Sequence, residues 1–278
     1  MTLRAPAKLN LCLYLGRPRD DGLHELRSLF CPLTLSDRIV VSDAERDEVV
    51  SPEVDGPNLV ETALIALRAR GWNRGPARIE IEKRIPVAAG LGGGSADAAA
   101  LLRLARDEVG EVGDLAAELG ADVPSQLDPT LALVGGAGET VEPLPAPRHF
   151  GVVLVPDENG LSTAQVYAEA DRMGLGREPD ELDSIAAKLR EAAGGGDSPL
   201  AYRELLMNDL AHAALSLRPG IAGALNALRD AGAEVALVTG SGPTAFGIFE
   251  DIAAADAAAV GLAPRFAGTI VAGPDPER

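Results

Sequence analysis

A glycine-rich junction at residues 90–96, GLGGGSA, restricts the folds open to this chain. It joins an alternating stretch typical of a β-strand to an Ala/Leu-rich stretch typical of an α-helix. Successive glycines let backbone N–H groups turn toward one point, and the helix that follows adds the positive end of its dipole. The junction therefore predicts an anion cradle suited to phosphate groups.

The kind of cradle can be narrowed from the residues around it. The segment lacks the Gly-Lys-Ser/Thr ending of a Walker A loop. It also misses the dinucleotide-binding fingerprint, because Ser95 stands where the third glycine belongs and a clean βαβ context is absent. When the loop is considered by itself, one alternative stays open: a glycine turn that only lets a helix pack on a sheet.

The order of the predicted elements indicates the fold class. Strands are predicted at residues 3–16, 25–41, 77–85, 151–156, 234–238, 245–249 and 269–271. Helices are predicted at residues 58–70, 95–109, 114–119, 162–172, 220–231 and 251–260. Because strands follow strands instead of alternating strictly with helices, we expect two α+β domains with mostly antiparallel sheets.

A proline-rich segment at residues 142–148 marks a change of composition. Three prolines fall within the five residues 143–147, which predicts a stiff, extended connection. A chain of 278 residues is long enough for two modest domains. We therefore expect an N-terminal domain over residues 1–146 and a C-terminal domain over residues 147–278.

Charge and composition exclude several classes of partner. The formal net charge of −17 disfavours nucleic acid and anionic membranes, since both need a basic surface. No apolar stretch reaches the length of a membrane span, and the first ten residues lack the pattern of an export signal. Cys12 and Cys31 do not make a disulfide framework, so a cytoplasmic setting is predicted. The three lysines are Lys8, Lys83 and Lys188.

Three segments together resemble the motifs of the galacto-, homoserine-, mevalonate- and phosphomevalonate-kinase (GHMP) superfamily. They read PAKLNL at residues 6–11, PVAAGLGGGSA at 86–96 and VTGSGPTA at 238–245, in the order of the family. The resemblance implies an α+β, two-domain GHMP kinase fold. Its N-terminal domain would be like the second domain of ribosomal protein S5, its C-terminal domain would be ferredoxin-like, and the site would lie between them.

Two further segments point to one branch of that superfamily. DGLHEL at residues 21–26 and GADVP at 120–124, together with GLGGGSADAA, resemble the kinases that act on 4-diphosphocytidyl-2-C-methyl-D-erythritol. The resemblance implies transfer of a phosphoryl group from ATP to the 2-hydroxyl of this small molecule, in the non-mevalonate route to isoprenoids. Magnesium is expected because such transfer usually requires it, and no metal ligand is assigned. Monomer and homodimer both stay open.

Three other functions remain as alternatives. A related GHMP kinase could use a different alcohol as its acceptor. A catalytically inactive relative could bind nucleotide as a sensor, although it would be expected to lack Lys8 or Asp122. A dinucleotide-binding oxidoreductase would rest on the glycine loop alone.

The resemblance assigns the catalytic roles to Asp122 and Lys8. Asp122 is the candidate general base, and an ordinary turn aspartate is the alternative. Lys8 lies on a predicted strand between apolar neighbours, and the alternative is a lysine on the solvated face of an edge strand. A partly buried lysine near Asp122 would favour the charged carboxylate and pull the substrate hydroxyl toward ionisation.

Binding roles follow from the same resemblance. The ATP side is expected to comprise Asn58 and Lys83 near the adenine, and Gly90, Gly92, Gly93, Gly94 and Ser95 around the phosphates. The acceptor side is expected to comprise Asn10 and His24 at the cytosine edge, Tyr167 stacked on the ring, Thr163 one turn before it, and Gly240 and Ser241. Asn58 also has capping-box spacing with Glu61, which is a structural reason for its presence.

The sequence departs from the branch at two places. Leu23 precedes the motif histidine where an aromatic residue, typically Tyr, is usual, and a leucine offers no π face to a base. Ser125 and Gln126 follow the GADVP segment where aromatic or apolar residues are usual. Both departures border the expected acceptor side.

Overall fold

The computed structural model describes residues 1–52, 56, 58–157 and 159–276. One sheet contains β1 (Thr2–Pro18), β2 (His24–Asp43), β3 (Glu48–Val50), β4 (Ala77–Glu82), β5 (Ala132–Gly135) and β6 (Thr140–Pro143). Its order is β3-β4-β2-β5-β6, with β1 paired to β2. All pairs are antiparallel except β3 with β4. A second sheet contains β7 (Gly151–Val155), β8 (Val235–Val238), β9 (Ala245–Phe249) and β10 (Ile270–Ala272).

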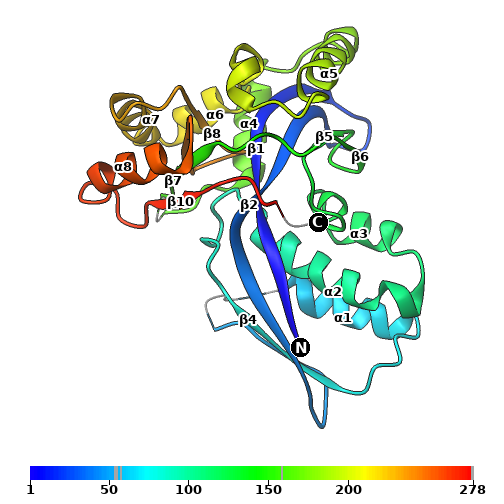
Figure 1. Cartoon of the computed structure of the whole chain (residues 1–278). Coiled ribbons are helices and arrows are strands. Elements are labelled where there is room, and N and C mark those ends of the chain that lie inside the picture. Colours follow the sequence, from blue (N-terminus) through cyan, green and yellow to red (C-terminus); the bar gives the residue numbers. More distant parts are fainter. Residues whose placement is uncertain (53–55, 57, 158, 277–278) are drawn as a thin grey trace.

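Helices cover both sheets. The N-terminal half of the chain contributes α1 (Leu59–Ala69), α2 (Gly93–Val109), α3 (Gly113–Leu119) and the 3₁₀ turn η1 (Pro124–Gln126). The C-terminal half contributes α4 (Thr163–Met173), α5 (Pro179–Ala193), the 3₁₀ segment η2 (Pro199–Leu205), α6 (Ala211–Leu217), α7 (Ile221–Asp230) and α8 (Ile252–Leu262). Figure 1 shows α1, α2 and α3 beside β1, β2 and β4, with α7 and α8 at the second sheet.

The second sheet has the topology of a ferredoxin-like domain. Its strand order is β10-β7-β9-β8, and every neighbouring pair is antiparallel. The chain enters through β7, crosses to β8 by way of helices, returns along β9 and reaches β10 through α8, which is the βαββαβ pattern. The predicted α+β class with mostly antiparallel sheets is therefore confirmed.

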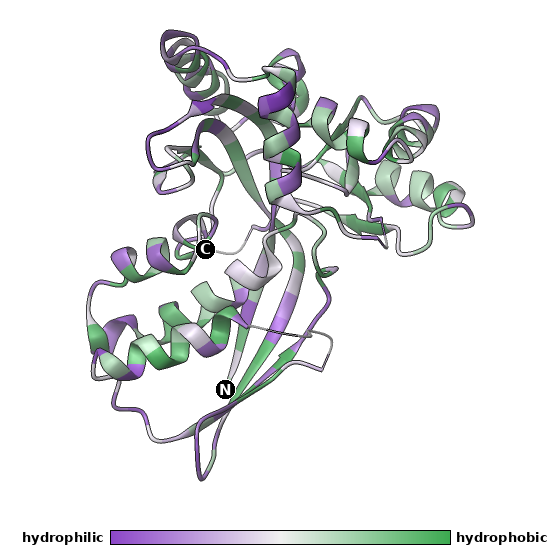
Figure 2. Ribbon diagram, turned by 180° about the vertical axis from the view of Figure 1, so that it is seen from behind, coloured by the Kyte–Doolittle hydropathy of each residue, from purple (hydrophilic) through white to green (hydrophobic). Residues whose placement is uncertain are grey.

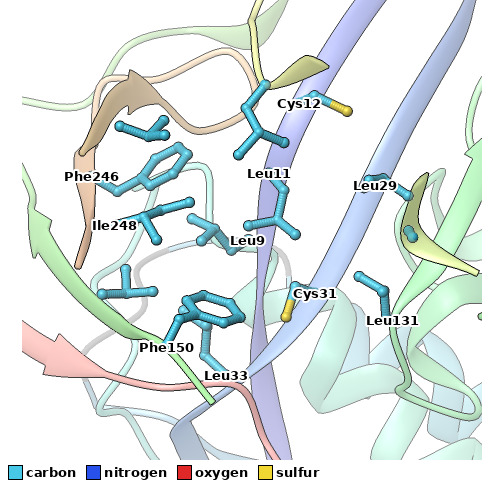
Figure 3. Close-up of a cluster of buried hydrophobic side chains, with 14 of the residues drawn as sticks. Leu9, Leu11, Cys12, Leu29, Cys31, Leu33, Leu131, Phe150, Phe246 and Ile248 are labelled. Atoms are coloured by element: carbon cyan, nitrogen blue, oxygen red, sulfur yellow. The ribbon is translucent and has the colours of Figure 1, made fainter. Parts of the chain in front are cut away.

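The long strands β1 and β2 connect two hydrophobic cores. Near the start of β1 they pack under α1, α2 and α3, in a core that includes Ala5, Ile39 and Leu101. Farther along β1 they meet the second sheet, and Figure 3 shows Leu9 and Leu11 opposite Phe246 and other side chains of that sheet. Since successive side chains of a strand point to opposite faces, burial of the odd-numbered leucines turns Lys8 and Asn10 toward the other side.

Hydropathy follows this arrangement. In Figure 2 hydrophobic residues concentrate along the strands of both sheets, and the helices carry alternating hydrophobic and hydrophilic positions. Among the described residues, none of the helices combines the length and apolar character needed to cross a membrane.

Several parts of the structure differ from the sequence-based expectation, among them the unpredicted short strand β3. The helix after the glycine loop begins at Gly93 and not at Ser95, because glycine in the first turn keeps helical geometry while leaving the amides uncovered. The hairpin of β5 and β6 was not predicted, because both strands are only four residues long. Helices α5 and α6 were also not predicted, although α5 has Pro179 in its first turn and buried residues at helical spacing.

Helix α5 bears directly on the predicted domain boundary. It follows residue 147 in sequence, yet it packs on β1, β2 and β5 of the first sheet. One core cluster likewise contains Leu11 from β1, Leu189 from α5 and Phe246 from β9. The division at residues 146 and 147 stays a prediction.

Candidate active site

The glycine loop presents an uncapped helix N-terminus. Gly92 is the N-cap of α2 in the left-handed region, with φ of 69°, and no side chain caps the helix. The amide of Ala96 makes the first helical bond, to the Gly92 carbonyl at 2.9 Å. The amides of Gly93, Gly94 and Ser95 come before that bond, so they have no intrahelical partner and are available to an anion.

A cavity of about 340 Å³ lies over this N-terminus. Its wall is formed by residues 86–95 together with Asn58, Leu59, Lys83 and Asp97. The sequence-predicted residues of the ATP side therefore meet around one cavity. Asn58 also caps α1, since its Oδ1 accepts a hydrogen bond from the amide of Val60 at 2.9 Å, which confirms its structural role.

Lys83 is fixed between two buried carboxylates. Its Nζ donates to Asp97 Oδ2 at 2.8 Å and also to Asp37 Oδ2. Asp37 further accepts from the amides of Arg84 and Ile85, at 2.6 and 2.8 Å. Burial works against the charge of Lys83, but the attraction of the two aspartates prevails and raises its pKa.

Asp97 is the member of this cluster with spare capacity. Burial raises its pKa to about 7, the Lys83 charge opposes that rise, and the nearby Asp37 charge adds to it. Its Oδ1 is buried and has no hydrogen-bond partner among the described residues, while the residue lines the cavity. Within the part of the chain that the structure describes, Lys83 is the one cation bonded to both Asp37 and Asp97, so the second oxygen of Asp97 can accept a hydrogen bond from a bound ligand or bind a cation that the ligand carries.

Replacing Asp97 by Asn is expected to change how stability depends on pH. The folded-state pKa of about 7 lies above the ordinary value of 3.8, so between about pH 4 and 7 the unfolded chain releases this proton first. The wild type therefore loses stability as pH rises through that window, whereas asparagine does not titrate. The stability of Asp97→Asn relative to wild type should rise by about 2 kcal/mol from pH 5 to pH 7, at about 1.36 kcal/mol for each pH unit.

Urea unfolding at pH 5, 6, 7 and 8 measures this difference. Asp107→Asn, which changes an exposed aspartate of the same helix, is the matched control. A difference between Asp97→Asn and wild type that stays constant across the series would contradict the expectation.

A second cavity, of about 250 Å³, shares the glycine loop with the first. Gly90, Gly92 and Ser95 line both cavities. The second is also lined by the predicted acceptor-side and catalytic residues Lys8, Asn10, Asp122, Thr163, Tyr167, Gly240 and Ser241. The loop is thus positioned to hold a phosphate donor on one side within reach of an acceptor on the other.

Lys8 and Asp122 form an ion pair in this second cavity. The Lys8 Nζ lies 3.2 Å from Asp122 Oδ2, and the lysine side chain is 7% exposed against 31% for the aspartate. The ammonium also lies 4.6 Å from the centre of the Phe30 ring. Gly92 permits this placement, because a Cβ at that position would lie 2.8 Å from Lys8 Cγ. The Asp122 carboxylate is therefore accessible to solvent and ligand, while the Lys8 side chain is buried against Phe30 and Gly92.

Asn10 holds the lysine in place. Its Oδ1 accepts from Lys8 Nζ at 2.7 Å, and its Nδ2 donates to Ser28 Oγ at 3.0 Å. Its backbone amide donates to Thr239 Oγ1 at 3.1 Å. The structure therefore directs both ends of this amide side chain to protein groups, and its predicted contact with a cytosine edge stays a prediction.

The third motif loop packs directly on the glycine loop. A Cβ on Gly90 would lie 2.9 Å from the Thr239 carbonyl oxygen and 3.0 Å from that of Gly242, so only glycine fits. Asn208 supports the loop by donating to the Gly240 carbonyl at 2.8 Å. Ser241 Oγ lies 2.9 Å from Thr163 Oγ1, which links the loop to the start of α4.

His24 and Tyr167 form an aromatic pair, in which Tyr167 lines the second cavity and His24 is not part of its lining. Their ring centres are 5.0 Å apart with a tilt of 50°. His24 Nε2 lies 2.8 Å from Asp171 Oδ1, one turn along α4 from Tyr167. Burial raises the pKa of Tyr167 to about 12, so the phenol stays neutral. Leu23, the residue before His24, is 53% exposed and lines neither cavity.

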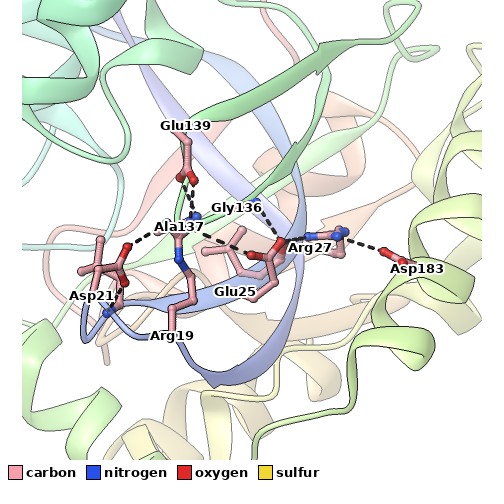
Figure 4. A network of polar contacts seen from close by, with 10 residues as sticks. Arg19, Asp21, Glu25, Arg27, Gly136, Ala137, Glu139 and Asp183 are labelled. Carbon is pink, nitrogen blue, oxygen red and sulfur yellow. Dashed lines mark hydrogen bonds and ion pairs between the residues drawn. The ribbon is translucent and has the colours of Figure 1, made fainter.

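A network of ion pairs fixes the turn that carries Leu23. Figure 4 shows Arg19 reaching Asp21 and Glu139, at 2.7 and 2.8 Å. Glu139 also accepts from the amide of Ala137, which lines the second cavity. The turn at residues 19–22 and the loop at residues 136–139 are therefore held together beside the acceptor side.

Several residues that shape the site were absent from the sequence-based set. Partners of predicted residues account for most of them: Ser28, Asp37, Asp97, Asp171, Asn208 and Thr239. Asp97 and Thr239 offered a local signal, because they lie within the quoted segments GLGGGSADAA and VTGSGPTA. Asp171 lies one helical turn after Tyr167. Outside the segments that carry the resemblance lie Ser28, Asp37 and Asn208.

The described side chains do not form a metal site of their own. Within the ranges that the structure describes, no cluster of three or more His, Cys, Asp or Glu side chains could hold an ion. The cavity of about 340 Å³ over the start of α2, the donor cavity, nevertheless fits a magnesium nucleotide, because it combines the amides of that helix start with the Asp97 oxygen that has no partner among the described residues. Phosphate oxygens and water are the ligands that Mg²⁺ usually keeps in such sites.

Comparison with known proteins agrees with this geometry. The chain matches the GHMP kinases N terminal domain over residues 58–136 and the GHMP kinases C terminal domain over residues 189–266. A crystal structure of 4-(cytidine 5'-diphospho)-2C-methyl-D-erythritol kinase superposes with a TM-score of 0.79 and 35% identity, covering 98% of each chain. Homoserine kinase from Cytophaga hutchinsonii, at 19% identity and a TM-score of 0.69, shares the fold over 99% of this chain and 94% of its own.

Relatives by sequence give the same family and confirm the predicted resemblance. The 4-diphosphocytidyl-2-C-methyl-D-erythritol kinase of Streptomyces avermitilis is 40% identical, over 94% of this chain and 92% of its own. That of Thermobifida fusca is 40% identical, over 99% of this chain and 96% of its own. The chain therefore belongs to the GHMP kinase superfamily and, within it, to the 4-diphosphocytidyl-2-C-methyl-D-erythritol kinase family.

Proposed function

We propose that the protein transfers the γ-phosphoryl group of ATP to the 2-hydroxyl of 4-diphosphocytidyl-2-C-methyl-D-erythritol, giving the 2-phosphate and ADP in isoprenoid synthesis. The observation that carries the proposal is the glycine loop shared by two cavities, with the Lys8–Asp122 pair in one of them. Relatives named as this kinase at 40% identity support the choice of acceptor.

On the donor side, the amides of Gly93, Gly94 and Ser95 would bind the phosphates at the start of α2. Magnesium bound to those phosphates would neutralise charge that builds up during transfer. The chain carries a net charge of −17, so these local groups must attract the nucleotide against an unfavourable overall field. Lys83, held by two carboxylates, would then form a fixed part of the cavity wall near the adenine.

On the acceptor side, Asp122 would accept the proton of the 2-hydroxyl. As that O–H bond breaks, the oxygen forms a bond to the γ-phosphorus, and the bond from this phosphorus to the bridging oxygen breaks to release ADP. Lys8 would stabilise the negative charge on the attacking oxygen, and Asn10 would hold the ammonium in register. The rest of the substrate would lie toward Thr163, Tyr167 and Ser241.

The test is ADP release from Mg-ATP that depends on the acceptor. Purified protein is mixed with Mg-ATP and 4-diphosphocytidyl-2-C-methyl-D-erythritol, and parallel reactions contain homoserine or mevalonate. Release with the cytidylyl compound alone is the expected result. Release with another alcohol instead would favour the second candidate, a GHMP kinase with a different acceptor, which the unusual Leu23 keeps open.

Leu23→Tyr is expected to improve acceptor binding. Leu23 is exposed and directly precedes His24, and a tyrosine there would offer a π face to the cytosine ring. An added aromatic contact is worth about 0.5–1.5 kcal/mol, so the KM for the acceptor should fall about 2- to 10-fold. The KM for ATP should stay unchanged, and steady-state kinetics with each substrate varied in turn distinguish the two. A rise in the KM for the acceptor would contradict the placement of the cytosine ring next to residue 23.

We also infer a cytoplasmic setting. Cys12 and Cys31 are both free and buried, and burial raises the pKa of each thiol to about 12. Neither is suited to disulfide exchange, which needs an accessible thiolate. Monomer and homodimer both stay predictions.

A further inference from the structure

Arg103 lies on the same helix as the phosphate cradle. Helix α2 begins at Gly93, and Arg103 follows ten residues later, about 15 Å along the axis. Its guanidinium turns away from the donor cavity and binds two backbone carbonyls. Nη2 donates to the Arg4 carbonyl at 2.7 Å, and Nη1 donates to the Gln126 carbonyl.

The two carbonyls belong to the two segments that carry Lys8 and Asp122. Arg4 precedes Lys8 by four residues on β1, and Gln126 follows Asp122 by four residues. Turn bonds make the second segment a single unit. Ser125 Oγ donates to the Asp122 carbonyl at 2.9 Å, and the Gln126 amide donates to the Val123 carbonyl at 3.0 Å.

The pairing of β1 with β2 does not by itself fix the separation of Lys8 and Asp122. The register of β1 against β2 shifts between Pro6 and Lys8, so the strand is irregular between Arg4 and the lysine. A side chain that binds both segments at once supplies a restraint that the sheet lacks. Arg103 binds the backbone carbonyl of Gln126, and the Ser125 hydroxyl joins the same turn to Asp122.

The surroundings of Arg103 are costly for a charge. Burial lowers its pKa to about 10, and the more distant Asp128 opposes that effect. No carboxylate within the described ranges forms an ion pair with it, whereas Arg106, one turn later, pairs with Asp128 at 3.0 Å on the surface. A guanidinium has the fixed fork of donors needed to span two carbonyls, which an ammonium lacks.

We propose that Arg103 is a positioning residue for the phosphoryl transfer, which sets the separation of Lys8 and Asp122 by tying their two segments to α2. The proposal rests on the proposed function, because it concerns the same reaction. One helix then fixes both the donor phosphates and the catalytic pair. Loss of the tie leaves the nucleotide cradle intact and disturbs the geometry at the acceptor oxygen.

Three variants test this role. Arg103→Met removes both bonds, Arg103→Lys keeps a charge but cannot span both carbonyls, and Arg106→Met is the matched control on the same helix. For the two Arg103 variants kcat should fall between about 10- and 100-fold, since a displacement of about 1 Å can cost that much. The KM and the dissociation constant for ATP should stay within about twofold, as should every constant of Arg106→Met.

The division of the effect between kcat and the KM for ATP separates positioning from general stability. A displaced catalytic pair slows the transfer step and leaves the phosphate cradle of α2 unchanged, so kcat should fall while the KM for ATP does not. Thermal unfolding of each variant measures folding independently. If Arg103→Met does not fold, Arg103→Lys decides the question.

Chemical rescue gives a further readout. A cavity of about 510 Å³ lined by Arg103, Arg106 and Leu144 opens beside the guanidinium. Methylguanidinium added to Arg103→Ala should restore part of kcat, and methylammonium should not. Wild-type kinase activity in the same assay supports the proposed function separately. Folded Arg103 variants with wild-type kcat would overturn the positioning role while leaving the kinase assignment intact.

Discussion

Asp122→Asn is expected to lower kcat by about 10²- to 10⁴-fold, the range that a positioned general base contributes. The carboxylate lies 3.2 Å from the buried ammonium of Lys8 and is itself 31% exposed toward the cavity. Asparagine has nearly the same shape, so it preserves the fold but cannot accept the hydroxyl proton. The KM for ATP should change little, because the donor cavity does not include Asp122.

Single-turnover phosphoryl transfer measures this effect apart from product release. Asp114→Asn, which changes an exposed aspartate in the first turn of α3, is the matched control and should keep wild-type kcat. ATP binding by Asp122→Asn, followed calorimetrically, shows that the donor side is intact. A variant with less than a tenfold loss of kcat would assign the proton transfer to another group or to water.

Local patterns in the sequence predicted the parts of the site that depend on short-range geometry. Alternation along β1 separates Lys8 and Asn10 from the buried Leu9 and Leu11. The glycine run predicts backbone amides gathered at the start of a helix, and the structure has that helix beginning at Gly93, two residues before the predicted Ser95. Both follow from backbone periodicity and from the freedom of glycine, which are properties of a few neighbouring residues.

Contacts between distant segments could not be read in the same way. Asn10 is held by Thr239, which is 229 positions away in sequence, and His24 is held by Asp171, which is 147 positions away. No periodicity links such residues, because the fold of both domains brings them together. Only the resemblance to a family placed the motifs in one site, and it named the motif residues without their supporting partners.

Helix α5 was missed although its local signals are present. Pro179 lies in its first turn, and its apolar residues, including Leu182 and Leu189, recur at helical spacing. It packs on the first sheet, so it adds to a core shared by both predicted domains. A boundary predicted from prolines alone carries no information about such packing across it.

Lys8→Met is expected to lower kcat by about 10²- to 10³-fold, the loss that follows removal of one preorganised group that stabilises transition-state charge. Methionine keeps an unbranched stem that fits against Gly92 and the Phe30 ring, where the lysine stem and ammonium now lie. It removes the positive charge facing Asp122. The attacking oxygen would then develop negative charge without a counter-charge beside it.

Stability should respond differently from activity in this variant. The Lys8 side chain is 7% exposed, and its loss leaves the Asp122 carboxylate without its cation and the buried Asn10 Oδ1 without its donor. Removing one partner of a buried pair destabilises the fold, so thermal unfolding should show a loss of about 1–3 kcal/mol. At temperatures where the variant is folded, kcat should still fall by orders of magnitude. Lys188→Met is the matched control, because Lys188 is an exposed lysine of α5 that lines neither cavity. Equal activity of Lys8→Met and Lys188→Met would show that the charge of Lys8 has no part in the transfer.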